Sequence, residues 1–437
     1  MVSDVFPRCI SRRRILKVGA AFAGATVPLG LLGRSVSTAA EPVKVGAIGS
    51  LTGVVSVWGK VLKEGAELAV EHINAEGGIL GRQVQLVLED DESKPDVGAR
   101  KARKLALEDK VDVIVGINHS GVLLSVLEQL PQIEKVIICS CATTSEATTQ
   151  RFNRYLFRVH ANSDQEGMSG ALYAKDLPHR RWSVIAPNYS YGFETWGSFI
   201  AQLKRLRPDI EPLDVQAWPA FGAADYSSHL ARLRAAKPDA VLCAMWGGDA
   251  VNLIRQARRF GIFDQIAVLS PTLGALDVLY ALGDEVPLGL HTDAHAYWFG
   301  APASDRVAAN TSFVGAYRKK FNAYPHSTAH WTYAAIKTFK RAAGKAQSVK
   351  TADLIAVLEG IEVDSPGITG TIRKEDHQVV HDIAWGRTVA FNEGGLKRGI
   401  GEVRWTPGNF VTPTLDEVLQ LRQKGGKADY YQYVKNI

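Results

Sequence analysis

Residues 43–50, VKVGAIGS, and residues 83–90, QVQLVLED, enclose a segment with a different periodicity, and this arrangement decides the fold. The first run is apolar and ends in Gly and Ser, and the second alternates; both patterns indicate strands. From 58 to 74, apolar residues recur every three or four positions, which predicts a helix that the two glycines at 77–78 end. A strand, a helix and a strand in this order predict a parallel βαβ unit.

The alternation continues along most of the chain. The predicted strands are 111–115, 136–140, 183–186, 213–217, 240–245 and 266–270, and the predicted helices begin at Pro95 or cover about 120–129, 192–206, 226–235 and 249–260. The rhythm restarts after Arg158, so we expect two α/β lobes whose parallel sheets are covered by helices on both faces. At 437 residues, the chain is also too long for one typical core and long enough for two.

The sequence beyond about residue 290 adds to both lobes. Helices are predicted at 305–321 and 328–343, and a Gly-rich β tail follows them. The tail is too long for a linker and too short for a third core, so we expect it to return to the two lobes.

The first 40 residues are predicted to be an export signal. SRRRILK (11–17) resembles the twin-arginine consensus, with Ile15 where the motif usually has Phe, and an apolar stretch too short to span a bilayer comfortably follows at 18–32. Small residues before Glu41 suit cleavage after Ala39 or Ala40. We therefore expect a periplasmic protein that is not inserted in a membrane after cleavage. A basic arm that stays attached is the alternative.

The net charge does not indicate a nucleic-acid partner. The chain has 51 basic and 45 acidic residues, and residues 1–40 hold six of the basic and one of the acidic ones. The remainder is therefore almost balanced, and no strong positive field favours DNA or RNA.

Cysteine and histidine residues give no strong metal or redox signal. Cys139, Cys141 and Cys243 each lie in a strand-like run, where buried thiols behave as small apolar residues. The pairs His291/His295 and His377/His381 have chelating spacing without the flanking pattern of a catalytic zinc helix, so surface or hinge positions are expected. Phosphate-binding, dinucleotide-binding and nucleophile-elbow motifs are absent. We expect no cofactor, no metal and no catalytic residue.

Polar or aromatic side chains follow four predicted strands. They lie in GINHSG (116–121), CSCATTS (139–145), PNYSYG (187–192) and MWGGD (245–249). In open parallel sheets, ligands bind beyond the carboxyl ends of the strands, where helix N-termini present free N–H groups. The sequence therefore predicts a ligand site between the two lobes.

The chain also resembles the periplasmic solute-binding proteins of ABC transporters, of the branched-chain amino acid and amide type. The resemblance is carried by residues 57–95, by LFRVHANSDQEG, YGFETWGSFIAQLK and ADYSSHLARLRAAKPDAVL, and by SFVGAYRKKFNAYP. It implies two Rossmann-like lobes, three hinge crossings and a small-molecule solute clamped between the lobes. The lobes would be residues 41–159 plus about 292–375, and 160–291 plus about 376–437.

The resemblance also implies a set of ligand-binding residues. The family serine that binds the ligand carboxylate matches Ser120, and the family threonine of the next loop matches Thr144. The full set is Trp58, Asn118, His119, Ser120, Ala142 through its carbonyl, Thr144, Tyr191 and Trp246. N-capping is the alternative role for Ser120 and Thr144, and ordinary packing is the alternative for the three aromatic residues.

One loop departs from the family. Amino-acid binders of this type hold the ligand ammonium with an acid in the loop that corresponds to SPTLGAL (270–276), which contains none; Asp277 is the nearest. An unpaired ammonium in a closed cleft costs several kcal/mol. We therefore expect a carboxylate or amide without an α-amino group, and Trp58 and Trp246 favour a bulky or aromatic body. Asp249 could also reach the cleft.

The resemblance implies a monomeric receptor that delivers its solute to the permease subunits of an ABC importer. Two alternatives use the same sequence features differently: a ligand-sensing clamshell receptor or regulator, and an exported hydrolase. No attached output domain supports the first, and no nucleophile–base arrangement supports the second.

Overall fold

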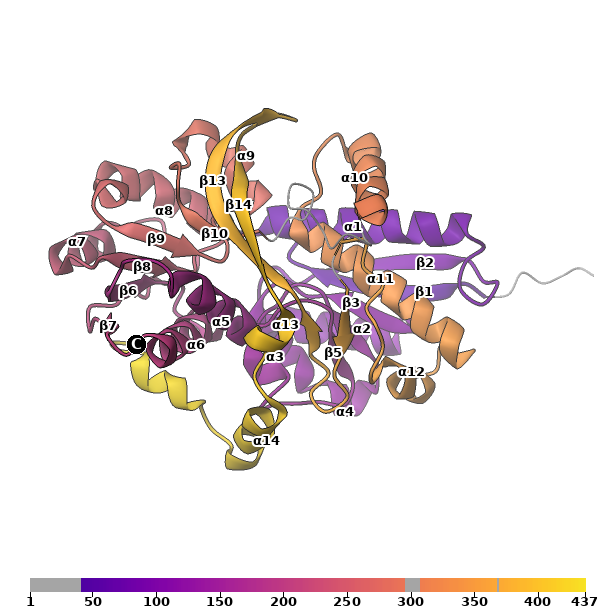
Figure 1. The fold of residues 1–437 in the computed structure, drawn as a ribbon. Coiled ribbons are helices and arrows are strands. Elements are labelled where there is room, and N and C mark those ends of the chain that lie inside the picture. Colours follow the sequence, from indigo (N-terminus) through magenta and orange to yellow (C-terminus); the bar gives the residue numbers. More distant parts are fainter. Residues whose placement is uncertain (1–40, 295–306, 368) are drawn as a thin grey trace, which may run out of the picture. The chain divides into compact units, whose positions relative to one another are not determined.

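A computed structural model describes residues 41–294, 307–367 and 369–437. The predicted export signal and His295 lie outside these residues. Two mostly parallel sheets dominate the described chain (Figure 1). We call the five-stranded sheet with its helices lobe I, and the seven-stranded sheet with its helices lobe II.

Lobe I begins with the predicted βαβ unit. Its elements up to the first crossing are β1 (Val43–Gly49), α1 (Ser56–Ala75), β2 (Val84–Asp90), α2 (Pro95–Leu107), β3 (Val113–Gly116), α3 (Ser120–Leu127), α4 (Leu130–Ile133), β4 (Ile137–Cys139), the 3-10 helix η1 (Ser145–Ala147) and β5 (Leu156–Arg158). The strand order is β2-β1-β3-β4-β5, and every pair is parallel.

Later sequence completes lobe I. It supplies α10 (Val307–Phe321), α11 (Ser327–Ala346), α12 (Thr351–Leu358) and the small antiparallel pair β11 (Gly370–Ile372) and β12 (Val379–His381). Alternate strand residues face opposite ways: Val113 and Val115 pack with α1 and α11, whereas Ile114 packs with α2 and α3. Gly65 lets α1 and α11 approach closely, because a Cβ there would lie 2.2 Å from the carbonyl oxygen of Ala329 (Figure 1).

Lobe II repeats this architecture around its own sheet. Its elements are α5 (Ser163–Ala174), β6 (Arg181–Ile185), α6 (Ser190–Leu206), β7 (Glu211–Pro212), α7 (Ser227–Ala236), β8 (Ala240–Cys243), α8 (Gly247–Arg259), η2 (Ile262–Asp264), β9 (Ala267–Ser270), α9 (Leu276–Leu282), η3 (Gly283–Glu285), β10 (His291–Asp293), β13 (Ile383–Glu393), β14 (Leu396–Thr406), α13 (Gly408–Val411), α14 (Leu415–Lys424) and η4 (Asp429–Tyr433). The strand order is β14-β13-β10-β9-β8-β6-β7.

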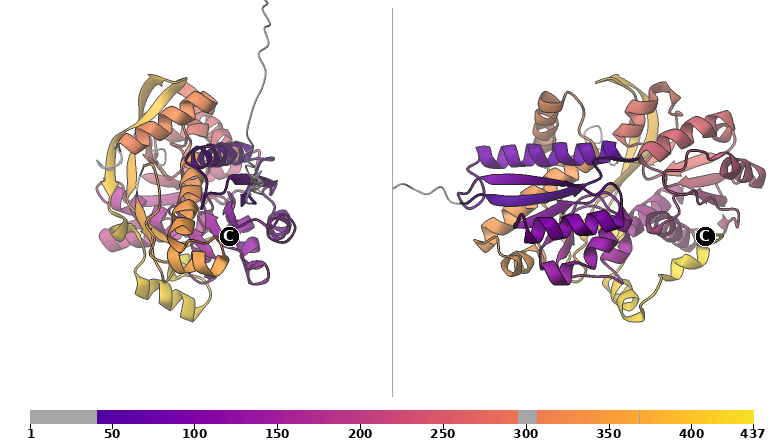
Figure 2. Two further views of the ribbon diagram at one scale, coloured as in Figure 1. Left: turned by 90° about the vertical axis from the view of Figure 1, so that its right-hand side faces the viewer. Right: turned by 180° about the vertical axis from the view of Figure 1, so that it is seen from behind.

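The β tail forms the antiparallel edge of the lobe II sheet. β13 pairs with β10 only over residues 385–387, so the β13–β14 ribbon extends beyond its neighbour (Figures 1 and 2). At the opposite edge, the strand predicted at 213–217 is wrong in its range: β7 covers only Glu211–Pro212, and residues 213–217 contribute a single bridge between Ala217 and Ile185. There the Gln216 side chain binds the C-terminal segment instead, because it accepts from the Lys435 amide at 2.8 Å and donates to the Tyr433 carbonyl at 2.8 Å.

The chain passes between the lobes three times. The crossings lie between β5 and α5, between β10 and α10, and between β12 and β13. Gln378, directly before β12, binds the first crossing, since its side chain accepts from Arg158 at 3.0 Å and donates to the His160 carbonyl at 2.7 Å. The predicted fold class, two α/β lobes joined by three crossings, is confirmed.

Candidate functional site

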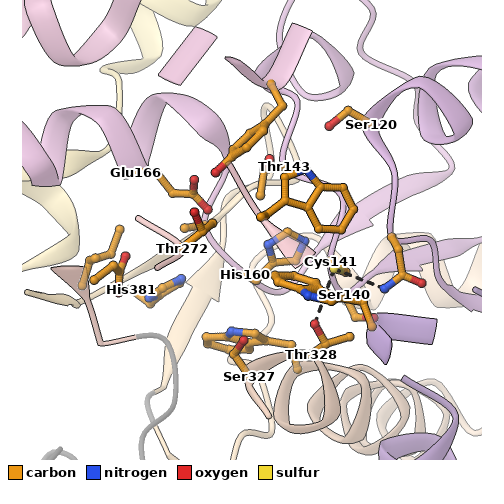
Figure 3. A pocket seen from close by; sticks show the side chains of 18 of the residues that line it. Ser120, Ser140, Cys141, Thr143, His160, Glu166, Thr272, Ser327, Thr328 and His381 are labelled. Carbon is orange, nitrogen blue, oxygen red and sulfur yellow. Dashed lines mark hydrogen bonds between the residues drawn. The ribbon is translucent and has the colours of Figure 1, made fainter. Parts of the chain in front are cut away.

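A cavity lies between the carboxyl ends of the strands of the two lobes (Figure 3). Its wall consists of Trp58, Asn118, Ser120, Ser140, Cys141, Thr143, His160, Ala161, Glu166, Tyr189, Tyr191, Trp246, Thr272, Asp293, Ser327, Thr328, Trp331, His381 and Ile383. This is the position that open parallel sheets offer to ligands.

The loop between β3 and α3 places Asn118 and Ser120 on the wall. Asn118 joins three strand ends, because its side-chain oxygen accepts from the Ser50 amide at 3.1 Å and its amide group donates to the Cys141 sulfur at 3.5 Å. Ser120 is the first residue of α3, and its Oγ accepts from the Thr144 amide at 3.3 Å. The N-cap of α3 is His119, whose Nδ1 accepts from the Gly121 amide at 3.1 Å.

His119 is a neutral acceptor in this arrangement. Burial lowers the pKa of its imidazole to about 4, so the ring is neutral at neutral pH. The Gly121 amide donates to Nδ1, which places the ring proton on Nε2. The ring also stacks on Tyr189 of lobe II, with ring centroids 4.7 Å apart. His119 therefore fixes α3 and the lobe–lobe contact without itself lying on the cavity wall.

A second helix of lobe I also begins at the cavity. Ser327 and Thr328 form the first turn of α11, and the N-cap His326 accepts from the Thr328 amide at 3.1 Å. The Ser327 and Thr328 side chains lie at the lower edge of the cavity in Figure 3. Helix N-termini carry partial positive charge, so α3 and α11 make the lobe I side of the cavity favourable for an anion.

Aromatic side chains from both lobes meet at the cavity. Trp58 of α1 lies edge-on to Trp246, with centroids 4.9 Å apart, and its indole nitrogen donates to Oδ2 of Asp277 at 2.8 Å. Trp246 in turn donates to the Tyr189 hydroxyl at 2.7 Å. Trp58 belongs to lobe I and the other three residues to lobe II, so these contacts close the cleft on one side.

Carboxylates and imidazoles occupy the lobe II and crossing segments of the wall. Glu166 lies in the first turn of α5 and Asp293 is the last residue of β10; each side chain is buried, with 3% exposure. His160 lies in the first crossing, His381 is the last residue of β12 directly before the third crossing, and both are buried. Figure 3 shows Glu166 beside Thr272, on the far side of the cavity from Ser120.

The structure brings five of the eight predicted site residues together on the wall: Trp58, Asn118, Ser120, Tyr191 and Trp246. His119, Ala142 and Thr144 lie behind it. The Thr144 hydroxyl points elsewhere because it donates to Oε1 of Glu194 at 2.8 Å, and Thr143 takes the wall position in the same loop. The Ala142 carbonyl accepts a weak bond from the Cys139 thiol at 3.5 Å.

The two acids that could have served an ammonium are engaged elsewhere. Asp277 accepts from Trp58 and lies 3.3 Å from Nε2 of His326. Asp249 accepts from the Gly222 amide at 2.8 Å, and burial raises the pKa of its carboxyl. Neither residue lies on the cavity wall, where the SPTLGAL loop contributes only Thr272.

The residues that sequence reasoning missed fall into two groups. Ser140, Cys141, Thr143 and Tyr189 lie inside loops that the sequence already marked as polar strand ends. The others come from the SPTLGAL loop (Thr272), from α11 and from segments in or beside the crossings, and LFRVHANSDQEG contains three of them: His160, Ala161 and Glu166. That stretch carried the family resemblance, but no local pattern showed that its side chains reach the cleft.

Residues 41–294, 307–367 and 369–437 contain no group of three or more His, Cys, Asp or Glu side chains arranged to hold a metal. In the same residues, no helix combines the length and apolar character needed to cross a bilayer. His377 stacks on Phe157 with centroids 3.9 Å apart, whereas His381 lies on the cavity wall, so this predicted histidine pair does not converge.

Known proteins share this architecture. The Leu/Ile/Val-binding protein BraC3 of Rhizobium johnstonii is 30% identical over 215 residues, which cover 49% of this chain and 57% of that protein. The Leu/Ile/Val-binding protein of Escherichia coli K12 is 26% identical over 327 residues, covering 75% and 85%. A solute-binding protein of an ABC transporter from Rhodopseudomonas palustris, solved in complex with 3,4-dihydroxybenzoic acid, has a TM-score of 0.74 and 24% identity, covering 84% and 97%.

The sequence profile of the periplasmic binding protein family matches residues 42–394, which include all three crossings and every strand of the two sheets except β14. Since this match extends over much more than half of the sequence, the chain belongs to the periplasmic binding protein family, as a leucine-binding-protein-like member.

Proposed function

We propose that this chain is the extracytoplasmic substrate-binding protein of an ABC importer, and that it closes its two lobes around a small carboxylate solute with a bulky or aromatic body. The observation that carries the proposal is the cavity between the strand ends, which both lobes line. Two helix N-termini and five large aromatic side chains face it: Trp58, Tyr189, Tyr191, Trp246 and Trp331.

The lobe I side would hold the solute carboxylate. Ser120 accepts from the Thr144 amide through its oxygen, which leaves its hydroxyl hydrogen to donate toward the cavity. Thr143, Ser327 and Thr328 add hydroxyl groups to the same wall. Hydroxyl donors beside two helix N-termini suit a carboxylate.

Aromatic residues would hold the body of the solute. Burial of an apolar group against Trp58, Trp246 and Trp331 supplies the larger part of the binding free energy. The relatives named as Leu/Ile/Val-binding proteins support an aliphatic body, and the neighbour complexed with 3,4-dihydroxybenzoic acid supports an aromatic one. The residues on this wall favour the aromatic body.

Closure and delivery complete the proposal. We infer lobe boundaries at 41–159 plus about 292–375 and 160–291 plus about 376–437. The strands support these boundaries to within a few residues, because β10 pairs in the lobe II sheet up to Asp293 and β12 pairs with β11 of lobe I up to His381. The twin-arginine motif supports export, with cleavage after Ala39 or Ala40. The closed, solute-bound form would then dock on the permease.

The test is a ligand panel applied to the processed protein. Thermal shift and calorimetry with leucine, phenylalanine, benzoate, 4-hydroxybenzoate and 3,4-dihydroxybenzoate should identify at least one ligand in the micromolar range or tighter. Chromatography of the incubated ligand should show no product. Conversion of the ligand would contradict a pure receptor role, and a panel without binding would contradict the solute class.

A further inference from the structure

We propose that Glu166 and Asp293 form a subsite that binds a hydrogen-bond donor of the solute, an ammonium or a hydroxyl, while lobe I binds its carboxylate. This inference rests on the proposed function and deepens it by specifying a second polar group on the solute. It replaces the expectation, drawn from the SPTLGAL loop, that nothing in the cleft accepts from an ammonium.

The first argument is the position of the acids. Among the residues that the structure describes, Glu166 and Asp293 are the carboxylates on the cavity wall. Asp277, the acid nearest to the SPTLGAL loop, is not on the wall and accepts from the Trp58 indole at 2.8 Å. The acids that can face a solute in this cavity are therefore in the first turn of α5 and at the end of β10.

The second argument is electrostatic. Ionised carboxylates only accept hydrogen bonds, and burial in a closed cleft makes an additional donor from the solute valuable. The same two carboxylates repel a carboxylate of the solute, whereas the N-termini of α3 and α11 attract it. The Glu166 side and the Ser120 side of the cavity therefore favour opposite groups, which orients the solute.

The third argument is location relative to the lobes. Ser120 belongs to lobe I, whereas Glu166 and Asp293 belong to lobe II. A solute with a carboxylate and a donor can therefore contact both lobes at once, and both contacts form only when the lobes close. The donor would thus contribute to selectivity and to closure together.

The experiment compares matched pairs by calorimetry on the wild-type protein. L-Phenylalanine and 3-phenylpropanoate differ by the ammonium, and 4-hydroxybenzoate and benzoate differ by the hydroxyl. In at least one pair, the member with the donor should bind about 10- to 100-fold more tightly, the range for a hydrogen bond to a charged group. The pair that shows the preference identifies the kind of donor.

Variants then assign the preference to residues. Glu166→Gln and Asp293→Asn should each reduce the preference for the donor-bearing member of the pair to less than about threefold. Asp277→Asn and the surface control Asp429→Asn should retain this preference. Thermal unfolding without ligand checks that each variant is folded, and the wild-type comparison stands even if a variant is not.

Three results would overturn the inference. Equal binding of both members in both pairs contradicts it and leaves the proposed function standing. Loss of the preference in Asp277→Asn with retention in Glu166→Gln places the donor site at the loop instead. Binding of none of the four probes contradicts the proposed function and the inference together.

Discussion

The hydroxyl of Ser120 contacts both the protein and the cavity. Its oxygen accepts from the Thr144 amide, and its side chain lies on the cavity wall. Thr144 has no such double contact, because its hydroxyl donates to Glu194. The two hydroxyl residues predicted to bind the solute therefore have different positions: Ser120 lies on the cavity wall, and Thr144 lies behind it.

Substitution of the two residues should separate these positions. Ser120→Ala should weaken binding of the best ligand of the panel by roughly 1.5–3 kcal/mol, the range for a hydrogen bond to a charged group. Thr144→Ala should leave affinity nearly unchanged and lower the free energy of unfolding by about 1–3 kcal/mol, because the buried Glu194 loses a donor. Calorimetry measures affinity and urea denaturation measures stability. A loss of affinity in Thr144→Ala as large as that in Ser120→Ala would contradict the assignment.

The site residues that directly follow strands could be predicted from the local sequence. Asn118, Ser120, Tyr191 and Trp246 follow buried strands directly, so local sequence fixes their place at the cleft. Glu166, Asp293 and His381 could not be predicted this way, because their positions depend on where the chain crosses between lobes. Such positions are set by tertiary packing rather than by local periodicity.

At the scale of elements, the alternation of strands and helices was predictable because apolar periodicity differs between them. The helix expected at 58–74 is α1, Ser56–Ala75, and the helix expected at 328–343 is α11, Ser327–Ala346. The absence of a strand at 213–217 was not predictable, because a segment distant in the sequence binds there: the Gln216 side chain contacts Tyr433 and Lys435. A partner more than 200 positions away leaves no local pattern.

Helix α6 carries a buried acid that joins the two lobes. Glu194 is fully buried and accepts from the Thr144 hydroxyl and the Ser145 amide of lobe I, each at 2.8 Å. Burial, with a contribution from Asp164, raises the pKa of Glu194 to about 8. Glu146, Arg158, Tyr430 and Tyr431 also face Glu194 and Asp164.

Glu194 should make stability depend on pH. A carboxyl whose pKa is higher in the folded protein than its ordinary 4.5 binds its proton more tightly after folding, so its contribution is present at low pH and is lost as pH rises through about 8. Wild-type protein should therefore lose free energy of unfolding between pH 5 and 9 relative to Glu194→Gln, when both are measured by urea denaturation.

The substitution Glu194→Gln is itself expected to lower the free energy of unfolding, and this loss at pH 5 is the reference for the comparison. The Gln side chain cannot accept from both lobe I donors, so Glu194→Gln should be less stable than wild type by about 1 kcal/mol at pH 5. The difference should narrow or reverse at pH 9. A difference that stays constant across this range would show that Glu194 does not titrate there.

At the scale of the whole molecule, the described arrangement is a closed one. Trp58 contacts Asp277, His119 contacts Tyr189, and the cavity wall draws on both lobes. Ligand-free protein should populate an open form in which these contacts are absent, because a ligand shifts such an equilibrium only by binding one state better. Small-angle scattering should show a smaller radius of gyration at saturating ligand. An unchanged radius despite measured binding would contradict closure.

The export route is a separate property of the full chain. Replacement of Arg12 and Arg13 by Lys should leave the precursor in the cytoplasm, since SRRRILK precedes only a weakly apolar stretch. Fractionation and immunoblotting measure the processed form outside the cytoplasm. Normal accumulation of that form in the double variant would contradict the twin-arginine route.

The contact between Trp58 and Trp246 gives the protein an intrinsic optical signal. Two indoles 4.9 Å apart, at an interplanar angle of 71°, are close enough for their electronic transitions to couple, and the two rings belong to different lobes. Separation of the lobes removes this coupling without any added label. The near-ultraviolet circular dichroism of the native chain should therefore follow opening and closing in real time, and Trp58→Phe should abolish that part of the signal.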